Sequence, residues 1–148
     1  MKAQWIVVAN ASLARFFKRD SSTEPLVALL TMEHPESRLR GHELAVDRPG
    51  HEATDNSSGG NRFEPRADPR RKEHLRFARE IAEHLDDALA KGGFESLVIC
   101  ASDPFLGELK AALSAAVRHH LQLALDSDFT SFGVAELERR LHDTRQEP

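Results

Sequence analysis

The residues best suited to chemistry in this sequence lie in one stretch, where a pair of glycines precedes a run of arginines. Gly59 and Gly60 are followed directly by Asn61. Paired glycines let a backbone approach another molecule closely, because no side chain stands in the way. The arginines that follow indicate that this other molecule carries negative charge, as phosphate does. The stretch therefore predicts close contact with an anionic partner.

The arginine run is a basic cluster in an acidic chain. Residues 62–79 contain seven basic and three acidic residues, a local charge of +4, whereas the whole chain carries −4. The basic residues are Arg62, Arg66, Arg70, Arg71, Lys72, Arg76 and Arg79. A chain of net charge −4 is not expected to coat nucleic acid over its whole surface, but a local basic patch remains compatible with it.

The basic cluster has two interpretations. In the first it is a solvated helix face, on which Arg76 pairs with Glu80 and Arg79 with Glu83 at a spacing of four. This accounts less well for the first four arginines, because acidic residues are sparse around them. In the second, these arginines and Lys72 contact an anion or an RNA backbone and release counterions on binding. Base stacking has little support, because only Phe63 and Phe77 are interspersed among the basic residues.

Other kinds of site find less support in the sequence. The eight histidines are scattered, and none forms a pair with metal-ligand spacing and an obvious third ligand, so we expect no metal and no other cofactor. Cys100 lies in an apolar run and is interpreted as an inert core residue. A hydrolase triad is not supported, because the sequence has no Gly-x-Ser-x-Gly motif. We interpret Ser102 and Asp103 as a helix N-cap, and the pair Asp126/Asp128 as solvated carboxylates.

The glycines and arginines must be positioned by a long polar segment and the helix after it. Residues 47–69 are almost devoid of apolar side chains, and loops of this length are usually functional or disordered, so we expect this loop to be mobile. Residues 70–91 predict a helix, with Asp68 as N-cap and Pro69 in the first position. Gly92 and Gly93 are expected to end it. Its apolar stripe consists of Leu75, Ala78, Ile81, Ala82, Leu85 and Leu89.

The rest of the chain alternates between apolar strands and helices. Residues 4–9, 14–18, 26–32, 95–101 and 121–125 predict strands. Residues 105–113, continued or kinked through 115–120, and residues 134–142 predict helices, whereas residues 36–46 would form at best a short helix. This order predicts an α/β domain with a mixed sheet and helices on one or both faces. With 148 residues, the chain is expected to form one domain, residues 1–148.

The sequence also bears on where the protein acts. No segment approaches the roughly 18 apolar residues that a membrane span requires. The apolar run at the N-terminus is too short for the core of a signal peptide. We therefore expect a cytoplasmic protein with no membrane partner.

Several motifs in a fixed order resemble one bacterial family. They are Trp5-Ile-Val-Val-Ala-Asn-Ala-x-x-Ala-Arg-Phe16, the glycine-rich loop, Leu75-Arg-Phe-Ala-Arg-Glu-Ile-Ala82, Leu97-Val-Ile-Cys-Ala101 with Leu106-Gly-Glu-Leu109, and Asp126-Ser-Asp-Phe-Thr130. Together they resemble the host attachment family, whose members are described as required for attachment to host cells. The likeness covers nearly the whole chain.

A more distant likeness bears on mechanism. The first motif, a Gly-Gly loop and Leu-Arg-Phe-Ala-Arg resemble the middle domain of archaeal and eukaryotic peptide-chain release factors. That resemblance implies an α/β fold with a mixed five-stranded sheet and helices packed on its faces. It also implies that Gly59, Gly60 and Asn61 match a Gly-Gly-Gln motif that promotes hydrolysis of peptidyl-tRNA in the ribosome. Asn61 is one methylene shorter than the matching glutamine.

These observations favour one function and leave two others open. The first is a factor that binds the ribosome or structured RNA and acts in translation release or rescue, with Gly59, Gly60 and Asn61 as catalytic residues and Arg62, Arg66, Arg70, Arg71 and Lys72 contacting nucleic acid. The second is a non-catalytic interaction module that influences host attachment or biofilm formation, with the loop folding on a protein partner. The third, a small-molecule hydrolase, lacks a recognisable nucleophile.

Overall fold

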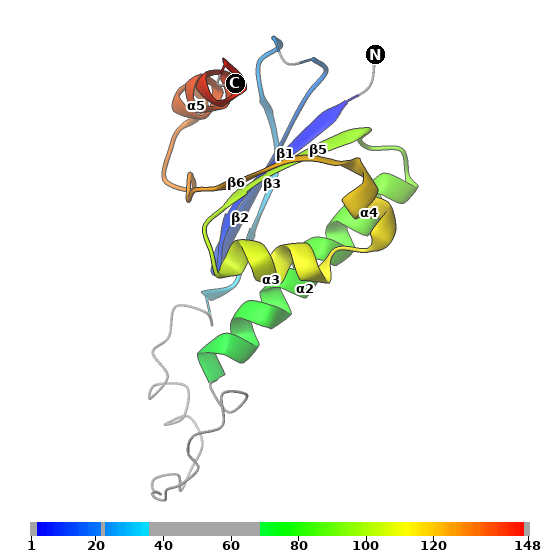
Figure 1. Ribbon diagram of the computed structural model, residues 1–148, viewed down its shortest axis with the longest axis vertical. Helices are drawn as coiled ribbons and strands as arrows, with labels where there is room; N and C mark the ends of the chain where they lie inside the picture. The colour runs from blue at the N-terminus through cyan, green and yellow to red at the C-terminus, as the bar shows by residue number, and fades with distance from the viewer. Residues whose placement is uncertain (1–2, 22, 36–68, 147–148) are drawn as a thin grey trace, which may run out of the picture.

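The centre of the protein is a five-stranded mixed sheet (Figure 1). The computed structural model describes residues 3–21, 23–35 and 69–146. The strands are β1 (Gln4–Asn10), β2 (Leu13–Arg19), β3 (Val27–Glu33), β5 (Ser96–Ala101) and β6 (Leu121–Asp126). They lie in the order β3-β2-β1-β5-β6. β1, β5 and β6 are parallel, whereas β2 runs antiparallel to both β1 and β3. The predicted mixed five-stranded sheet is confirmed.

The two central strands are buried on both faces. Every residue of β1 except Asn10 is buried, and so is every residue of β5 after Ser96. Unbroken burial of this kind gives a continuous apolar run instead of an alternating one, as in strands covered by helices on both sides. Successive side chains therefore enter two separate cores, which share the sheet between them.

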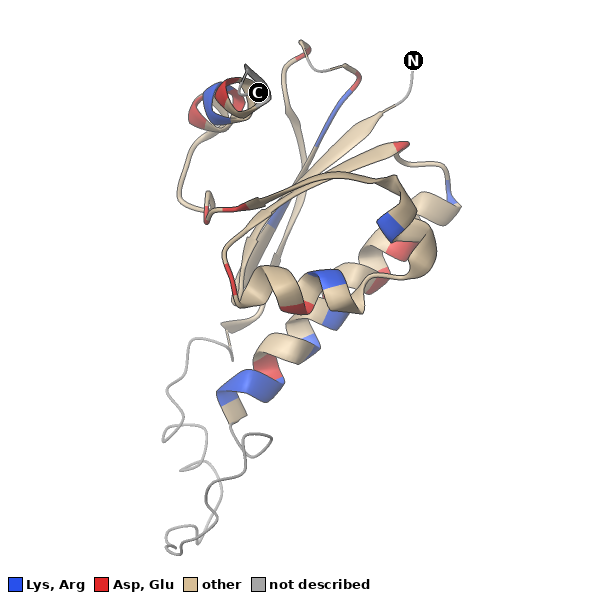
Figure 2. Ribbon diagram, in the orientation of Figure 1, with Lys and Arg blue, Asp and Glu red and all other residues tan. Residues whose placement is uncertain are grey.

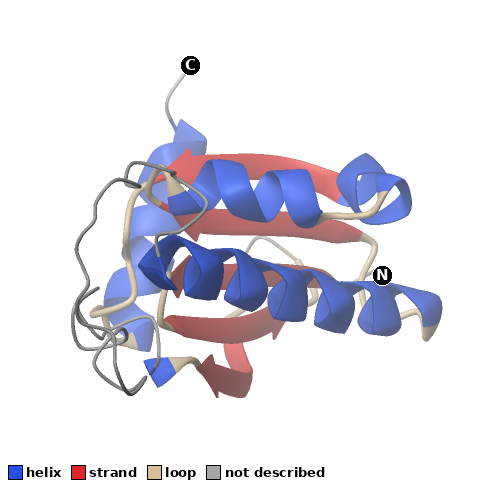
Figure 3. Ribbon diagram, turned by 90° about the horizontal axis from the view of Figure 1, so that it is seen from below, coloured by secondary structure: helices blue, strands red, loops and turns tan. Residues whose placement is uncertain are grey.

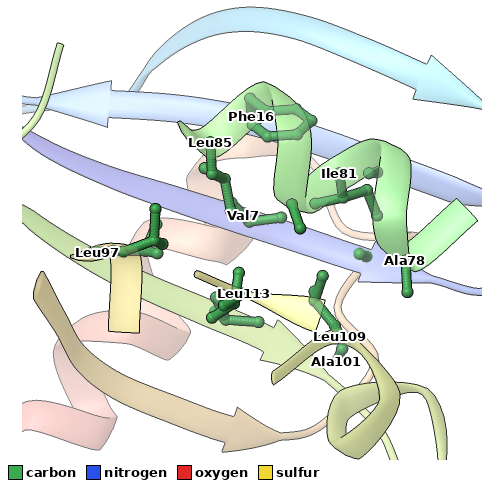
Figure 4. Close-up of a cluster of buried hydrophobic side chains, with 14 of the residues drawn as sticks. Val7, Phe16, Ala78, Ile81, Leu85, Leu97, Ala101, Leu109 and Leu113 are labelled. Atoms are coloured by element: carbon green, nitrogen blue, oxygen red, sulfur yellow. The ribbon is translucent and has the colours of Figure 1, made fainter. Parts of the chain in front are cut away.

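Three helices cover the first face: α2 (Pro69–Ala90), α3 (Phe105–Ala112) and α4 (Ala115–His120). Figure 3 shows helices side by side over the sheet, running roughly along the strands. In this core Val7 and Phe16 of the sheet meet Ile81 and Leu85 of α2 and Leu109 of α3, all fully buried (Figure 4). The predicted apolar stripe of α2 is largely confirmed, although Leu75 and Leu89 are only half-buried. Phe77 is also fully buried, so it is a core residue and does not stack on bases.

The fourth helix, α5 (Val134–Gln146), covers the second face. Leu137 and Leu141 of α5 are buried against Ile6 and Val8 of β1 and Cys100 of β5. This second core is smaller than the first. It nevertheless excludes water from the other side of the central strands, so helices pack on both faces of the sheet.

The residues at the two ends of α2 explain where the helix begins and where it ends. The helix begins at Pro69, whose fixed φ and missing N–H suit the first helical position. It ends before Gly92, which adopts a φ of 75°, a conformation that favours glycine. The N–H of Gly92 donates to the carbonyl of Leu89, and that of Gly93 to the carbonyl of Ala88. The predicted termination at this glycine pair is confirmed.

The helical region after β5 divides in two. α3 ends at Ala112, and Ser114 then caps α4, its Oγ accepting a hydrogen bond from the N–H of Val117 at 3.1 Å. The kink left open in the sequence is therefore a separate short helix. The remaining elements lie within a few residues of their predicted positions, whereas the predictions for residues 36–46 and for the loop up to residue 68 lie outside the described residues.

Ile81 provides a test of the first core. The side chain is fully buried against the sheet, so Ile81→Ala should lower the free energy of unfolding by about 2–5 kcal/mol, through lost burial and the cavity that remains. Urea denaturation followed by circular dichroism would measure this change. Glu83→Ala, at an exposed position of the same helix, is the control and should change stability by less than about 0.5 kcal/mol. Equal effects would contradict the assigned packing.

Candidate functional site

One edge of the sheet brings together polar residues from separate segments of the chain. β1, β3, β5 and β6 all run in the same direction and end at this edge, which we call the carboxyl edge. It is marked by Asn10, His34, Asp103 and Asp126, and by Arg70 at the start of α2. The end of β3 and the start of α2, between which segment 36–68 lies in the sequence, are both at this edge (Figure 1). In α/β proteins, ligands bind preferentially beyond the carboxyl ends of parallel strands.

Three of the predicted basic residues form the first turns of α2. Arg70, Arg71 and Lys72 are exposed, and Figure 2 shows basic residues at this end of the helix. Arg71 lies 3.5 Å from the carboxylate of Glu108 on α3, yet its side chain remains 53% exposed. The first turn of α2 contains no acidic residue. Cations are disfavoured at a helix N-terminus, where the helix dipole is positive and anions bind.

The remaining arginines of the cluster, Arg76 and Arg79, do not form the predicted ion pairs. Arg76 pairs with Glu73 at 3.1 Å and a spacing of three, so the predicted Arg76/Glu80 pair is wrong. Glu80 instead lies 3.9 Å from His34. Within the described part of the chain, Arg79 forms no ion pair with Glu83. His34 lies close to both glutamates, and the spacing of residues along a helix cannot predict a contact with a residue outside that helix.

His34 joins the end of β3 to the start of α2. Its Nε2 lies 2.8 Å from the Glu73 carboxylate, and its ring stacks on Phe77 with centroids 5.2 Å apart. Its backbone N–H also donates to the carbonyl of Ser12 at 2.9 Å. The residue is 7% exposed. These contacts hold together the two points at which the chain leaves and re-enters the described fold around segment 36–68. Nothing in the sequence distinguished this histidine from the other seven.

The β1–β2 turn anchors the loop between β6 and α5. Asn10 Nδ2 donates to the hydroxyl of Thr130 at 3.1 Å, while its Oδ1 accepts from the backbone N–H of Ser12. Arg15 donates to the carbonyl of Thr130 at 3.0 Å and to that of Phe132. Its guanidinium also lies over the ring of Phe17. The side chains of Asn10, Arg15 and Thr130 therefore hold the loops of the carboxyl edge together, a role that the sequence analysis missed.

The carboxylates after β5 and β6 are structural as well. Asp103 Oδ1 accepts from the N–H of Gly107 in the first turn of α3, but the N-cap is Pro104, so the cap predicted at Ser102 and Asp103 lies one residue too early. Asp126 accepts from the N–H of Asp103 at 3.0 Å. Asp128 accepts from both the N–H and the hydroxyl of Thr130. Asp126 and Asp128 are both exposed, as expected of solvated carboxylates, and they also accept hydrogen bonds from nearby loop residues.

The predicted reactive centre itself cannot be placed. Gly59, Gly60, Asn61, Arg62 and Arg66 lie outside the described residues.

Among the described residues we also looked for a reactive cysteine, a metal site and a membrane-spanning helix. Cys100 is fully buried in β5, and burial raises the pKa of its thiol to about 12, so it is a poor nucleophile. In the described ranges, no group of three or more His, Cys, Asp or Glu side chains is arranged to hold a metal ion. Within the same ranges, none of the helices is both long enough and apolar enough to cross a membrane.

Comparison with known sequences decides the family. Residues 5–141 match the family described as proteins required for attachment to host cells. The chain belongs to this host attachment family. No curated protein matches the sequence. Two motifs by which the chain resembles host attachment proteins, one around Asn10 and Arg15 and the other ending at Thr130, contact each other directly at the carboxyl edge.

Solved structures provide a second comparison. The archaeal translation termination factor aRF1 superimposes with a TM-score of 0.49 and 11% sequence identity, over 97% of this chain and 39% of that one. A structure described only as an archaeal protein gives a TM-score of 0.45 and 12% identity, over 97% of this chain and 38% of that one. The chain thus spans less than half the length of either protein.

Arg15 provides a test of the carboxyl edge. Arg15→Met should lower the free energy of unfolding by about 1.5–3 kcal/mol, because it removes charge-assisted hydrogen bonds and leaves two backbone carbonyls without their donor. Thermal or urea unfolding would measure the loss. Arg118→Met, at an exposed position of α4, should be nearly neutral. A neutral Arg15→Met would show that the anchor contributes nothing to stability.

Proposed function

We propose that this host attachment protein binds the ribosome or structured RNA through the basic start of α2 and the adjoining segment 36–68, and that it acts in translation release or rescue. The observation that carries the proposal is the exposure of Arg70, Arg71 and Lys72 at the N-terminus of α2. The proposal extends this surface to Arg62 and Arg66, which precede the helix in the sequence.

The electrostatics of this helix end support an anionic partner. Three cations at a helix N-terminus oppose the helix dipole and repel one another, which costs stability. Phosphate reverses both effects, because it neutralises the side chains and accepts hydrogen bonds from the unpaired backbone N–H groups of the first turn. The contact of Arg71 with Glu108 is long, at 3.5 Å, and leaves the arginine side chain 53% exposed. An RNA backbone supplies phosphates at a spacing that a row of such residues can follow.

In the proposed reaction, the loop approaches the ester bond of peptidyl-tRNA. Gly59 and Gly60 allow close approach because they lack side chains. The backbone N–H and the side-chain amide of Asn61 would orient the attacking water, while the arginines neutralise neighbouring phosphates. Water then adds to the ester carbonyl, and the tRNA hydroxyl leaves with a proton.

An effect on attachment to host cells would then be indirect, through synthesis of the proteins that perform the attachment. The second candidate, a non-catalytic interaction module with a protein partner, rests on the family description and on the same exposed surface. The two candidates differ in the partner that the basic surface binds, and this difference can be measured.

Charge reversal tests the binding surface. The triple variant Arg66→Glu, Arg70→Glu and Arg71→Glu should lose binding to purified ribosomes without unfolding, since Arg70 and Arg71 are exposed. The matched control reverses Arg118, Arg139 and Arg140, which are exposed on α4 and α5, and makes the same change in net charge. Co-sedimentation at increasing salt would measure binding, and the log–log slope should be about one unit per phosphate contact. Equal loss in both variants, or binding that salt does not weaken, would contradict a localised phosphate surface.

Substitutions in the glycine motif test the reaction. Gly60→Ala should abolish hydrolysis of peptidyl-tRNA on stalled ribosomes, since a methyl group obstructs close approach, while ribosome binding persists. Asn61→Gln should preserve or raise the rate, because it restores the reach of the release-factor amide. Ser57→Ala, in the same segment, is the control and should leave the rate unchanged. Wild-type protein that binds ribosomes but gives no hydrolysis above the ribosome-only blank would favour the interaction module.

A further inference from the structure

A cavity lies under α5, at the end of the sheet opposite the carboxyl edge. It has a volume of about 300 Å³ and is bounded by the start of β1, the end of β2, the neighbouring strands β5 and β6, and the end of α5. Its apolar walls are Val98, Leu123 and Leu141, and its polar lining is Gln4, Arg19, Gln122 and Thr144. Pockets of this size, mostly apolar with a few polar groups, are typical of small-molecule sites.

A line of hydrogen-bonded polar side chains runs along one wall. Arg19 is only 5% exposed, and its Nε donates to the Oε1 of Gln4 at 2.9 Å. Gln4 Nε2 in turn donates to the Oε1 of Gln122 at 2.8 Å. Burial of a guanidinium is costly unless hydrogen bonds compensate it. This line fixes the orientation of Gln122, whose own amide N–H groups donate no hydrogen bond within the described residues.

A single cationic side chain lines the cavity. Among its lining residues only Arg19 is formally charged, because the others are amides, a hydroxyl and aliphatic side chains. Arg19 also borders an adjoining cavity of about 370 Å³, where Glu24 and Glu138 supply acidic groups. Glu138 is engaged there, since its carboxylate accepts from the N–H of Leu26 at 2.8 Å. The two cavities share Arg19, but acidic side chains line only the second.

The cavity is placed where a ligand could enter. α5 packs on the sheet through Leu137 and Leu141, and Figure 1 shows the helix lying to one side of the strands. Thr144 follows Leu141 by one helical turn and also lines the cavity, and its hydroxyl donates to the carbonyl of Arg140. Sequence analysis did not point to this region, since its residues are spread over four strands and a helix.

We propose that this cavity binds a small organic carboxylate with an apolar body. The carboxylate accepts hydrogen bonds from Arg19 and from the amide of Gln122, and the apolar body packs on Val98, Leu123 and Leu141. The volume equals that of roughly ten waters at ~30 Å³ each, which suits a single ring or a short chain. The site is distinct from the proposed RNA surface, and its occupancy does not depend on that proposal.

The experiment compares an acid with its neutral amide. Phenylacetate, hexanoate and phenylacetamide are each titrated into the full-length protein and followed by NMR. Either acid should give saturable shifts at Gln122, Leu123 and Leu141, and phenylacetate should bind about tenfold or more tightly than phenylacetamide, because a charge-assisted hydrogen bond is the stronger kind. Absence of saturation by both acids at about 10 mM would overturn the proposal. Saturation with shifts elsewhere in the protein would overturn it as well.

Two pairs of variants sharpen the test. Thr144→Trp should fill part of the cavity and abolish binding, whereas Asp143→Trp, on the adjacent residue with a 58% exposed side chain, should retain it. Arg19→Met should remove the preference for phenylacetate over phenylacetamide. Because Arg19 is buried and this variant can unfold, Gln122→Leu at an exposed position provides the second measurement and should reduce the same preference. An unchanged preference in a folded Arg19→Met, or in Gln122→Leu, would contradict recognition of the carboxylate.

Discussion

The burial of β1 and β5 on both faces is the constraint on which the rest of the structure depends. Their side chains alternate between two cores, so neither face can be left to water without exposing a row of large apolar groups. One face requires α2, α3 and α4, and the other requires α5. Because parallel strands need crossover connections, the chain must also return to the same end of the sheet each time. The ends of β1, β3, β5 and β6 therefore lie together at the carboxyl edge.

At the carboxyl edge, stability and binding make opposing demands. Asn10, Arg15 and Asp126 form hydrogen bonds with backbone groups where loops converge. The start of α2 does the reverse, since it places cations where the helix dipole disfavours them. A fold that tolerates such a local cost is expected to recover it by binding, as functional sites commonly do. This contrast separates the structural part of the edge from the part that we propose contacts RNA.

The two ends of the sheet have different characters. The carboxyl edge carries exposed charge on a helix and is suited to a large, charged partner. The opposite end encloses Arg19 beside an apolar wall and is suited to a small molecule. Both arise from one arrangement, because α2 begins at one end of the sheet and the last turn of α5 closes over the other. The host attachment family description concerns neither surface directly, so each must be tested by its own ligand.

The sequence by itself determined the strands, the apolar stripe of α2 and the termination of that helix. These features depend on periodicity and on residues such as Gly92, whose effects are confined to neighbouring positions. Only the tertiary structure decided which polar side chains meet. Arg15 and Thr130 are 115 residues apart, and His34 and Glu73 are 39 apart, so no local pattern records their contacts. The cavity around Arg19 likewise exists only when four strands and α5 pack together, because a volume enclosed by distant segments has no signature in any one of them.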